Sequence, residues 1–192
     1  MKENLERRQR ILNAARDVFA REGFRIAEVK TIATQAGVGK ATIYKHFESK
    51  EDLLLNLVQE NFRCIRDIAL KSLIGAGHPL QRFENTCMAI ADYLNQNRNF
   101  STVVVREAGE FLPEIQNIYN TVVGENQAFA DAFFDAMKSE GMIPDIPNAT
   151  LLELLMNLTI GTVYSWTLSD DERDLRKEVA SLFRLWHERT GK

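Results

Sequence analysis

The sequence predicts an all-α protein of about nine helices, divided between residues 1–48 and a larger domain of residues 49–192. Apolar residues recur every three or four positions along most of the 192-residue chain, which is the spacing of amphipathic helices. Helix-breaking residues are scarce, with 4 Pro and 10 Gly, and 45% of the residues are hydrophobic. The composition therefore favours a folded helical protein with a substantial core over a disordered chain.

The charge is distributed unevenly between the two predicted domains. Residues 1–50 contain 11 Lys and Arg against 6 Asp and Glu, whereas residues 51–192 contain 13 against 21. The net charge of −3 thus hides a basic N-terminal segment on an acidic body. This asymmetry indicates that only the N-terminal segment meets a polyanion. Because the basic excess is modest, we expect strong binding to need two copies of the chain.

The first helix is predicted over Leu5–Arg21 and ends at Gly23. Its apolar residues form a single stripe of Ile11, Ala14, Ala15, Val18 and Phe19. Arg7, Arg8 and Arg10 take other faces of this helix. They are either an ordinary solvated helix end or contacts to phosphate, and the sequence leaves both open.

The stretch Val29–Phe47 predicts two short helices joined by a tight turn at Gly37, because glycine accepts a left-handed backbone without penalty. Ile43 and Phe47 lie four residues apart and are expected to face the core. Cations, hydroxyls and an aromatic ring remain for the outer face, and such groups contact phosphates and base edges. These residues are Lys40, Thr42, Tyr44, Lys45 and His46. We interpret the stretch as a DNA-binding helix-turn-helix, with a surface helical hairpin as the alternative.

The larger domain begins with a long helix whose start resembles a capping box at Ser49–Asp52. Its apolar stripe continues to about Leu73, so one element runs from the DNA-binding unit into the acidic body. The further helices are predicted over residues 79–94, 100–106, 113–139, 149–168 and 171–188.

Several classes of protein are disfavoured by what the chain contains. The three histidines, His46, His78 and His187, belong to no catalytic or metal-binding motif, so we expect no enzyme, no cofactor and no metal. Cys64 and Cys87 lack metal-type spacing and are interpreted as buried thiols, with a disulfide as the alternative. The charge-free run 154–169 is too short to span a membrane. The N-terminus has no apolar signal core, and we expect a cytoplasmic protein.

The last two helices predict a homodimer. Residues 151–166 are apolar on nearly all faces, and two copies packed as a four-helix bundle would cover them. The alternative is a central helix buried within a monomer. A dimer would also place two DNA-binding units about one helical turn apart on a palindrome. The expected interface residues are Leu152, Leu155, Thr159, Leu182, Phe183 and Trp186.

The run GFRIAEVKTIATQAGVGKATIYKHFESKEDLL, residues 23–54, resembles the TetR family of bacterial transcriptional regulators. The resemblance rests on the skeleton IA–AGV–TIY–HF–SKE–LL, and the body is similar to the family only in its helix layout. It implies that the N-terminal domain binds a double-stranded operator and that a small hydrophobic effector, bound by the body, releases it. A TetR-like activator and a helical adaptor that binds a protein partner remain open alternatives.

Residue by residue, the resemblance assigns DNA-binding positions to Lys30, Thr31, Gly39, Lys40, Ala41, Thr42, Tyr44, Lys45, His46 and Lys50. The chain departs from the family pattern at Ala27, Gly39 and Ala41, where the family usually has Thr, Ser and Gly. Ala27 and Gly39 each lack a capping hydroxyl, so the helix starts are weakened or Glu28 caps the second helix instead.

The effector pocket is expected between the fourth, fifth, seventh and eighth helices, with acyl-CoA as the leading effector class. The candidate effector residues are Phe62, Cys87, Arg106, Tyr119, Asn126 and Trp166. Arg106 is the one charge in an apolar neighbourhood and suits an anionic effector; the alternative is a surface ion pair with Glu107 or Glu110.

Overall fold

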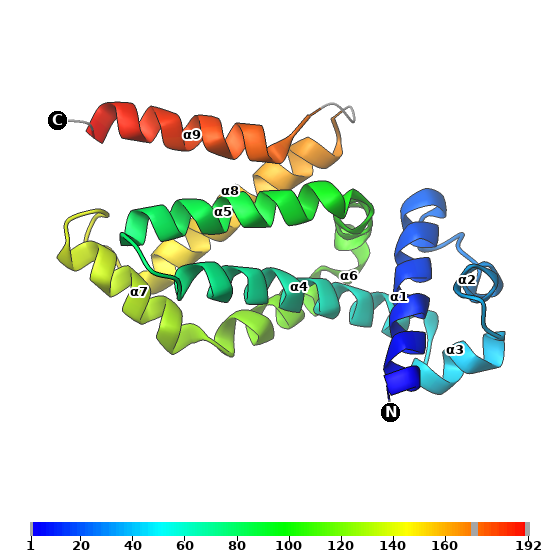
Figure 1. Cartoon of the computed structure of the whole chain (residues 1–192). Coiled ribbons are helices and arrows are strands. Elements are labelled where there is room, and N and C mark those ends of the chain that lie inside the picture. Colours follow the sequence, from blue (N-terminus) through cyan, green and yellow to red (C-terminus); the bar gives the residue numbers. More distant parts are fainter. Residues whose placement is uncertain (1, 170–172, 191–192) are drawn as a thin grey trace. The chain divides into compact units, whose positions relative to one another are not determined.

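The computed structural model describes residues 2–169 and 173–190, with the side chains of all of these except residues 108 and 185–190. Every element of regular secondary structure in the described part of the chain is an α-helix, and the predicted all-α class is confirmed (Figure 1). The helices are α1 (Lys2–Glu22), α2 (Val29–Ala36), α3 (Lys40–His46), α4 (Lys50–Leu73), α5 (Pro79–Gln96), α6 (Arg98–Gly124), α7 (Gln127–Ser139), α8 (Asn148–Thr167) and α9 (Leu175–Thr190).

The chain packs as two compact units, which we call the first and the second unit. The first unit consists of Met1–Arg63 and Asn99–Thr121, and the second of Cys64–Arg98 and Val122–Lys192. The expected domain boundary between residues 48 and 49 divides the chain into two continuous segments, whereas each observed unit combines two separate segments. Packing assigns the N-terminal half of α4 and most of α6 to the same unit as the three N-terminal helices.

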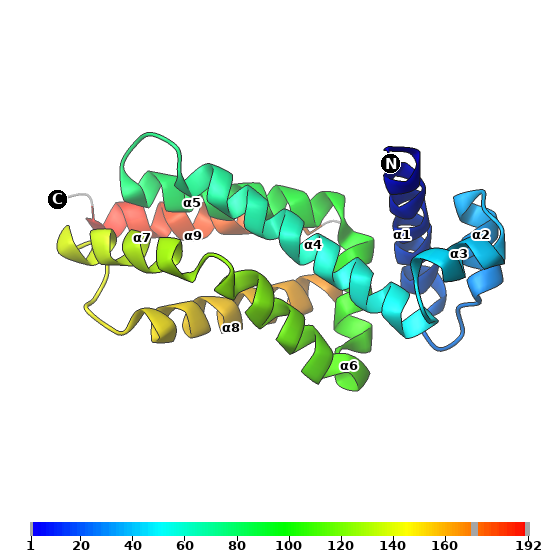
Figure 2. The ribbon, with the colours of Figure 1, turned by 90° about the horizontal axis from the view of Figure 1, so that it is seen from below.

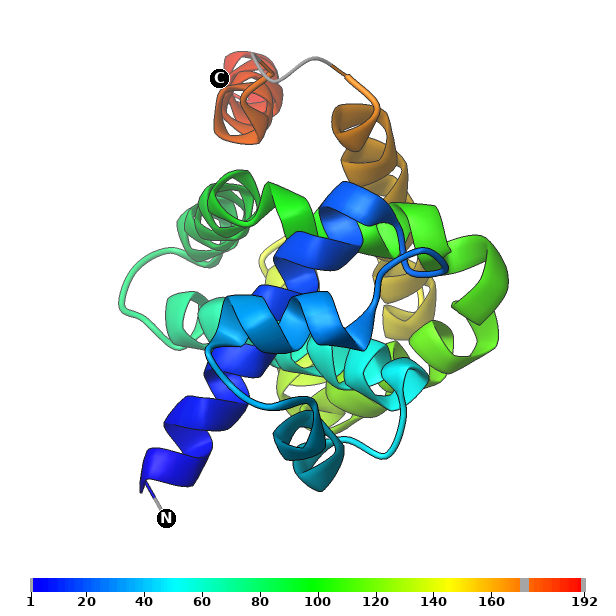
Figure 3. The same cartoon turned by 90° about the vertical axis from the view of Figure 1, so that its right-hand side faces the viewer.

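The core of the first unit forms where α1, α2, α3 and the start of α4 meet. Val18 and Phe19 of α1 are completely buried there, together with Ile32 of α2 and Leu53 of α4. The predicted stripe of α1 thus faces the core. Before Ile11 the side chains of α1 are exposed or half-buried, and Figure 3 shows these N-terminal turns extending beyond the rest of the unit.

The ends of the short helices follow the predicted local chemistry. Gly37 adopts φ 66°, and its amide bonds to the carbonyl of Thr34 while that of Val38 bonds to Ala33, which is the Schellman arrangement. At the start of α4, the Asp52 amide donates to the Ser49 hydroxyl at 3.0 Å. The Asp52 carboxylate accepts from the Glu48 amide, one residue earlier than a regular capping box would place it.

The predicted helix over residues 113–139 ends at Ser139 as expected, but its start is wrong and it is interrupted. One helix, α6, runs through Pro113 to Gly124, with a break at Phe111 (φ −114°, ψ 23°). Proline cannot donate to the preceding turn, so the break lies just before it. A second interruption at residues 125–126 separates α6 from α7, because the chain turns there and Asn126 starts the new helix.

In the second unit, α5 and α9 lie side by side and run in opposite directions (Figures 1 and 2). Trp166 of α8 is buried against Ala91 and Leu94 of α5 and Leu175 of α9. A second cluster gathers Phe133, Phe134 and Met137 of α7 with partly buried residues of α4, α5 and α8. The second unit therefore has a core of its own.

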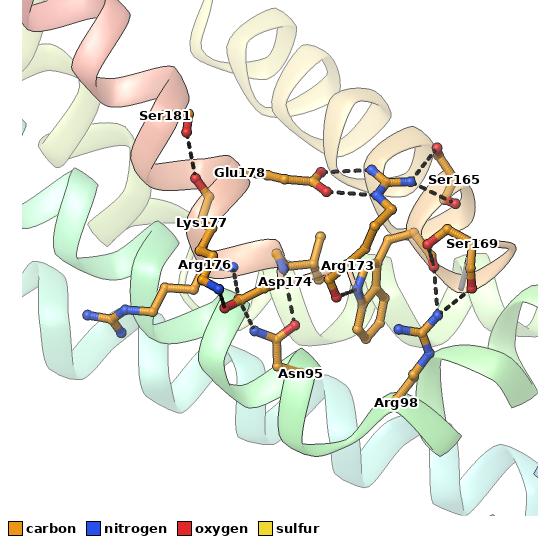
Figure 4. A network of polar contacts seen from close by, with 12 residues as sticks. Asn95, Arg98, Ser165, Ser169, Arg173, Asp174, Arg176, Lys177, Glu178 and Ser181 are labelled. Atoms are coloured by element: carbon orange, nitrogen blue, oxygen red, sulfur yellow. Dashed lines mark hydrogen bonds and ion pairs between the residues drawn. The ribbon is translucent and has the colours of Figure 1, made fainter. Parts of the chain in front are cut away.

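A polar network joins the end of α8 to the start of α9 and to α5 (Figure 4). The Arg173 guanidinium binds both carboxylate oxygens of Glu178, at 2.7 and 2.8 Å. The Asn95 side chain donates to Asp174 at 2.7 Å and accepts from the Leu175 amide. These hydrogen bonds lower the pKa of Asp174 and of Glu178. The network fixes where α9 begins.

Candidate nucleic-acid interface

Helix α3 presents a polar outer face because its apolar residues are used inside. Ile43 and Phe47 are both 1% exposed and anchor the helix in the core of the first unit. The residues between and before them point outward: Lys40, Ala41, Tyr44 and Lys45 are exposed, and Thr42 and His46 are half-buried. The predicted division of this helix into a core side and an outer side is confirmed.

Tyr44 is the one large aromatic side chain on this outer face, with 46% of its surface exposed. The Lys40 ammonium lies 5.8 Å from the centre of the Tyr44 ring, one turn away. A cation over an aromatic face is attracted to it. This pair therefore places a positive charge and a phenol hydroxyl side by side, which suits a phosphate and its neighbouring base edge.

Helix α2 contributes a second polar surface near its start. Lys30 is exposed and Thr31 is half-buried, whereas Val29 faces the core. Glu28 occupies the N-cap position without a side-chain hydrogen bond, so the suggested self-capping by Glu28 does not occur. Gly39 likewise leaves the start of α3 without a side-chain cap, as its sequence predicted.

Lys50 does not lie as the family resemblance led us to expect. Its ammonium donates to three backbone carbonyl oxygens, those of Phe24, Arg25 and Ala27, at 2.8, 3.3 and 3.1 Å. It also lies 4.6 Å from the centre of the Phe24 ring. Three carbonyl oxygens thereby surround the ammonium group, so Lys50 holds the loop between α1 and α2.

The arginines at the start of α1 differ in their surroundings. Arg7 pairs with Glu3 on the same helix at 2.7 Å. Arg8 donates to Asn56 at 2.8 Å, and its guanidinium lies 5.3 Å from the Phe47 ring. Arg8 thus ties α1 to α4. Arg10 is exposed and remains a candidate for phosphate contact.

Three of the expected effector residues belong to the first unit. Phe62 and Tyr119 meet edge to face, with ring centres 6.1 Å apart, and burial raises the pKa of Tyr119. The effector contact of Arg106 stays a prediction, and its expected alternative partners Glu107 and Glu110 bind the Phe24 amide and Arg25. The Arg106 guanidinium donates to the Ala20 carbonyl oxygen at 2.6 Å, at the end of α1, because the first half of α6 packs on that helix.

The other three belong to the second unit. Cys87 is half-buried, and burial together with the Glu84 carboxylate raises the pKa of its thiol to about 11. Asn126 starts α7, where its carbonyl oxygen accepts from two amides of that helix. Trp166 is 1% exposed and packs within its own core, so we do not assign it to an effector. Cys64 is exposed, contrary to the expected buried thiol.

The expected dimer residues divide by their surroundings. Leu152 and Leu155 pack partly into the core beneath α8, whereas Thr159 and Leu182 are exposed. Phe183, which we expected at the dimer interface, is instead buried within its own unit. Its ring meets that of Phe83, with ring centres 6.1 Å apart. The side chain of Trp186 lies outside the described residues.

Sequence reasoning missed a set of α6 residues that contact α1 and the loop after it. Glu107 accepts the Phe24 amide at 3.0 Å, and Glu110 pairs with Arg25 at 2.9 Å. Asn99 donates to Asp17 of α1 at 3.2 Å. These residues repeat at roughly three and four positions, but the stripe mixes charged and apolar residues, so hydrophobic periodicity does not reveal it.

Two other kinds of site are absent from the described part of the chain. Among the helices that the structure describes, none combines the length and the apolar character that crossing a bilayer requires. Within the described ranges, no three His, Cys, Asp or Glu side chains gather as they do around a metal ion.

Comparison with known proteins agrees with the geometry. The sequence model of bacterial regulatory proteins of the tetR family matches residues 11–57, which cover the buried stripe of α1, all of α2 and α3, and the start of α4. The transcriptional regulator UidR of Escherichia coli K12 is 27% identical over 187 residues, covering 90% of this chain and 86% of that protein. The fatty acid metabolism regulator protein of Bacillus subtilis is 26% identical over 181 residues, covering 91% of each.

Solved structures share the same helical layout. The fatty acid degradation regulator FadR of Bacillus halodurans superposes with a TM-score of 0.82 at 23% identity, covering 93% of both chains. FadR of Bacillus subtilis, solved in complex with stearoyl-CoA, superposes with a TM-score of 0.80 at 22% identity, covering 92% of this chain and 96% of that one. With its helix-turn-helix and its match to the family model over residues 11–57, the chain has the DNA-binding domain of the tetR family of bacterial regulatory proteins and is a DNA-binding transcriptional regulator.

Proposed function

We propose that this regulator is a homodimeric repressor that binds a palindromic operator and is released by a fatty acyl-CoA. The observation that carries the DNA-binding part is the outer face of α3, where Lys40, Tyr44 and Lys45 are exposed above the buried Ile43. Cations and a phenol on one side of a short helix match the chemistry of a major groove lined by phosphates. We expect the protein to act in the cytoplasm, because bacterial DNA lies there.

Base and phosphate contacts are assigned to the exposed residues of both short helices. Lys40 and Lys45 suit phosphates or guanine, Thr42 and Tyr44 suit base edges, and the methyl group of Ala41 suits a thymine methyl. Lys30 and Thr31 of α2, the Gly39 amide and His46 are proposed to contact the sugar–phosphate backbone. Lys50 is left out of this set because carbonyl groups occupy its ammonium.

The proposed dimer uses α8 and α9. Helix α8 leaves large apolar residues exposed on two of its faces, and on each face these residues recur every four positions. These residues are Leu154, Leu158, Ile160, Tyr164 and Leu168, and Leu182 of α9 is exposed as well. Monomers rarely expose so many large apolar side chains on one helix, so a second copy is the simplest cover.

A surface pocket beside α8 is also consistent with contact by a second copy of the chain. It measures about 350 Å³, and its lining includes Leu158, Gly161 and the Arg173–Glu178 pair. Glycine leaves room at this point for a side chain of the second copy, since nothing lies within 4 Å of where its Cβ would be. Thr159, which is exposed on the same helix, stays in the proposed interface.

The effector class is inferred from the relatives and from the apolar side chains of the body. One relative is named as a fatty acid metabolism regulator, and one structural neighbour holds stearoyl-CoA. A long acyl chain needs an apolar lining, and in the first unit the aromatic pair of Phe62 and Tyr119 is the candidate for it. In the second unit the half-buried Cys87 is a separate candidate. Asn126 is retained as a polar candidate.

A selection experiment tests the proposal even though the operator sequence is not yet defined. A duplex is selected from a random pool by the purified protein, and its affinity is measured with and without stearoyl-CoA. We expect a palindromic duplex, a stoichiometry of two chains, and an affinity loss of about tenfold or more with the acyl-CoA, the size of a typical coupling. Failure to select any duplex contradicts the DNA-binding part, and an affinity unchanged by acyl-CoAs contradicts the effector.

The same purified protein and selected duplex also test the two alternatives, an activator and an adaptor that binds a protein partner. A relative from Mycolicibacterium smegmatis, FasR, is named as an activator, so a reporter assay with the selected duplex decides between repression and activation. An adaptor that binds a protein through α3 would show no steep loss of DNA affinity with salt. Several phosphate contacts predict such a loss.

A further inference from the structure

The loop between α1 and α2 is held from two sides by two different helices. On one side, the Lys50 ammonium of α4 binds the carbonyl oxygens of Phe24, Arg25 and Ala27. On the other side, the Glu107 carboxylate of α6 accepts the Phe24 amide at 3.0 Å. Glu107 is 8% exposed, which makes it a carboxylate buried in the first unit. A buried charge is costly unless its partners are well placed, so this contact constrains the loop.

The Phe24 side chain is fixed as firmly as its backbone. Its ring meets Phe111 of α6 edge to face at 5.1 Å and Phe19 of α1 at 5.5 Å. The Lys50 ammonium lies 4.6 Å from the ring centre. Phe24 is thus the residue on which α1, α4 and α6 converge, and its position cannot change without breaking contacts to all three.

Helix α6 approaches this loop with one continuous stripe. Asn99, Val103 and Arg106 contact or pack on α1, and Glu107 and Glu110 contact the loop after it. The stripe stops at the helix break at residue 111. The first half of α6 is therefore part of the DNA-binding unit, although it lies far away in the sequence.

The loop leads directly into the DNA-facing part of α2. Ala27 is two residues from Val29, where α2 begins, and Lys30 and Thr31 lie in its first turn. We propose that Glu107 and Lys50 are positioning residues for DNA binding: together they hold the α1–α2 loop, and through it the start of α2, in the register that the operator requires. Both helices that carry them continue beyond the first unit, α4 to Leu73 and α6 to Gly124.

For the removal of the Glu107 carboxylate, a positioning role and simple electrostatics predict opposite changes in DNA affinity, which allows a clear test. Removing a carboxylate from a DNA-binding unit makes it more positive, so a purely electrostatic effect would strengthen binding to DNA. A positioning role predicts weaker binding instead. Glu107→Ala leaves the buried Phe24 amide without its acceptor, whereas Glu107→Gln removes the same charge but keeps an oxygen that can accept.

The experiment uses the full-length protein and a duplex selected by the wild type, with no effector present, so it does not depend on the acyl-CoA assignment. Affinity is measured over a range of salt concentrations, at a temperature where circular dichroism shows each variant folded. We expect Glu107→Ala to bind about tenfold more weakly and with a shallower salt dependence, since fewer phosphates are contacted. Glu107→Gln should stay within about threefold of the wild type.

Glu110→Ala is the matched control, because Glu110 lies on the same face of α6 but its pair with Arg25 is exposed. It should bind like the wild type or slightly better. If Glu107→Ala does not fold, Glu107→Asp replaces it. This variant keeps the charge, but its shorter side chain does not reach the Phe24 amide. It should show a smaller loss of DNA affinity than Glu107→Ala. A folded Glu107→Ala or Glu107→Asp with unchanged affinity and salt slope, or an equal loss in Glu110→Ala, overturns the proposal.

Discussion

The Arg98 guanidinium lies 4.4 Å from the centre of the Trp166 ring and donates to the Trp166 carbonyl oxygen at 3.0 Å. It also donates to the carbonyl oxygen of Ser169 at 2.7 Å, beyond the end of α8 (Figure 4). One side chain from the start of α6 therefore closes the end of α8 and covers the buried indole.

Replacing this arginine should destabilise the second unit. Arg98→Met keeps an unbranched stem but removes both hydrogen bonds and the cation, and we expect a loss of about 2 kcal/mol in the free energy of unfolding. Urea denaturation followed by circular dichroism and tryptophan fluorescence measures it. The exposed Arg63 provides the control, and Arg63→Met should change stability by less than about 0.5 kcal/mol.

Tyr44→Ala should weaken binding to a selected operator by about 1–3 kcal/mol, because the exposed ring and hydroxyl are proposed to contact the duplex. Helicity and the dimer should be unchanged, since the side chain is not part of the core. Tyr44→Phe separates the two groups: a loss as large as that of Tyr44→Ala assigns the contact to the hydroxyl. Wild-type affinity in Tyr44→Ala would remove the residue from the interface.

Gly39→Ser should stabilise the first unit by about 0.5–1 kcal/mol, through a capping hydroxyl and a stiffer unfolded chain. The backbone there has φ −78° and ψ 150°, which serine adopts freely, and an added Cβ would meet only the Thr42 hydroxyl at 3.9 Å. Gly37→Ser is the matched control. At φ +66° it should destabilise by about 1 kcal/mol, and thermal melts compare the two.

Leu158→Asp should convert the protein to monomers, because the leucine is 68% exposed on the proposed dimer face. A charge at that position must be desolvated in the interface but remains in water in the monomer. Light scattering coupled to size exclusion reports the mass. Leu112→Asp, at an exposed leucine of α6, should leave the dimer intact, and a dimer surviving in Leu158→Asp at micromolar concentration contradicts the proposed interface.

The two cysteines should differ in their reaction with iodoacetamide. Cys87 has a pKa raised to about 11, so its thiol stays protonated at pH 8, whereas Cys64 is exposed. We expect Cys64 to be alkylated at least about tenfold faster at pH 8 by mass spectrometry. Because an unfolded Cys87 ionises at lower pH than the folded one, this residue should also reduce stability as pH rises from 9 towards 11.

The sequence alone was sufficient for the helix-turn-helix. Its signals are local: the apolar spacing of Ile43 and Phe47, a left-handed turn at Gly37 and the cap at Ser49 each depend on residues a few positions apart. Periodicity also placed most other helices within a few residues. It missed the separation of α6 from α7, because the apolar pattern continues through the turn at Asn126.

Only the tertiary structure decided which groups the charged side chains contact. Lys50 and Arg106 looked like ligands for phosphate and effector, yet both bind backbone carbonyls 23 or more positions away, and Glu107 binds an amide 83 positions away. Trp166 and Phe183 looked like pocket and interface residues but are covered by their own unit. A sequence shows that a residue is apolar or charged, and so which helix face it takes. Which partner it meets depends on chain folding that brings distant segments together, and no local spacing encodes that.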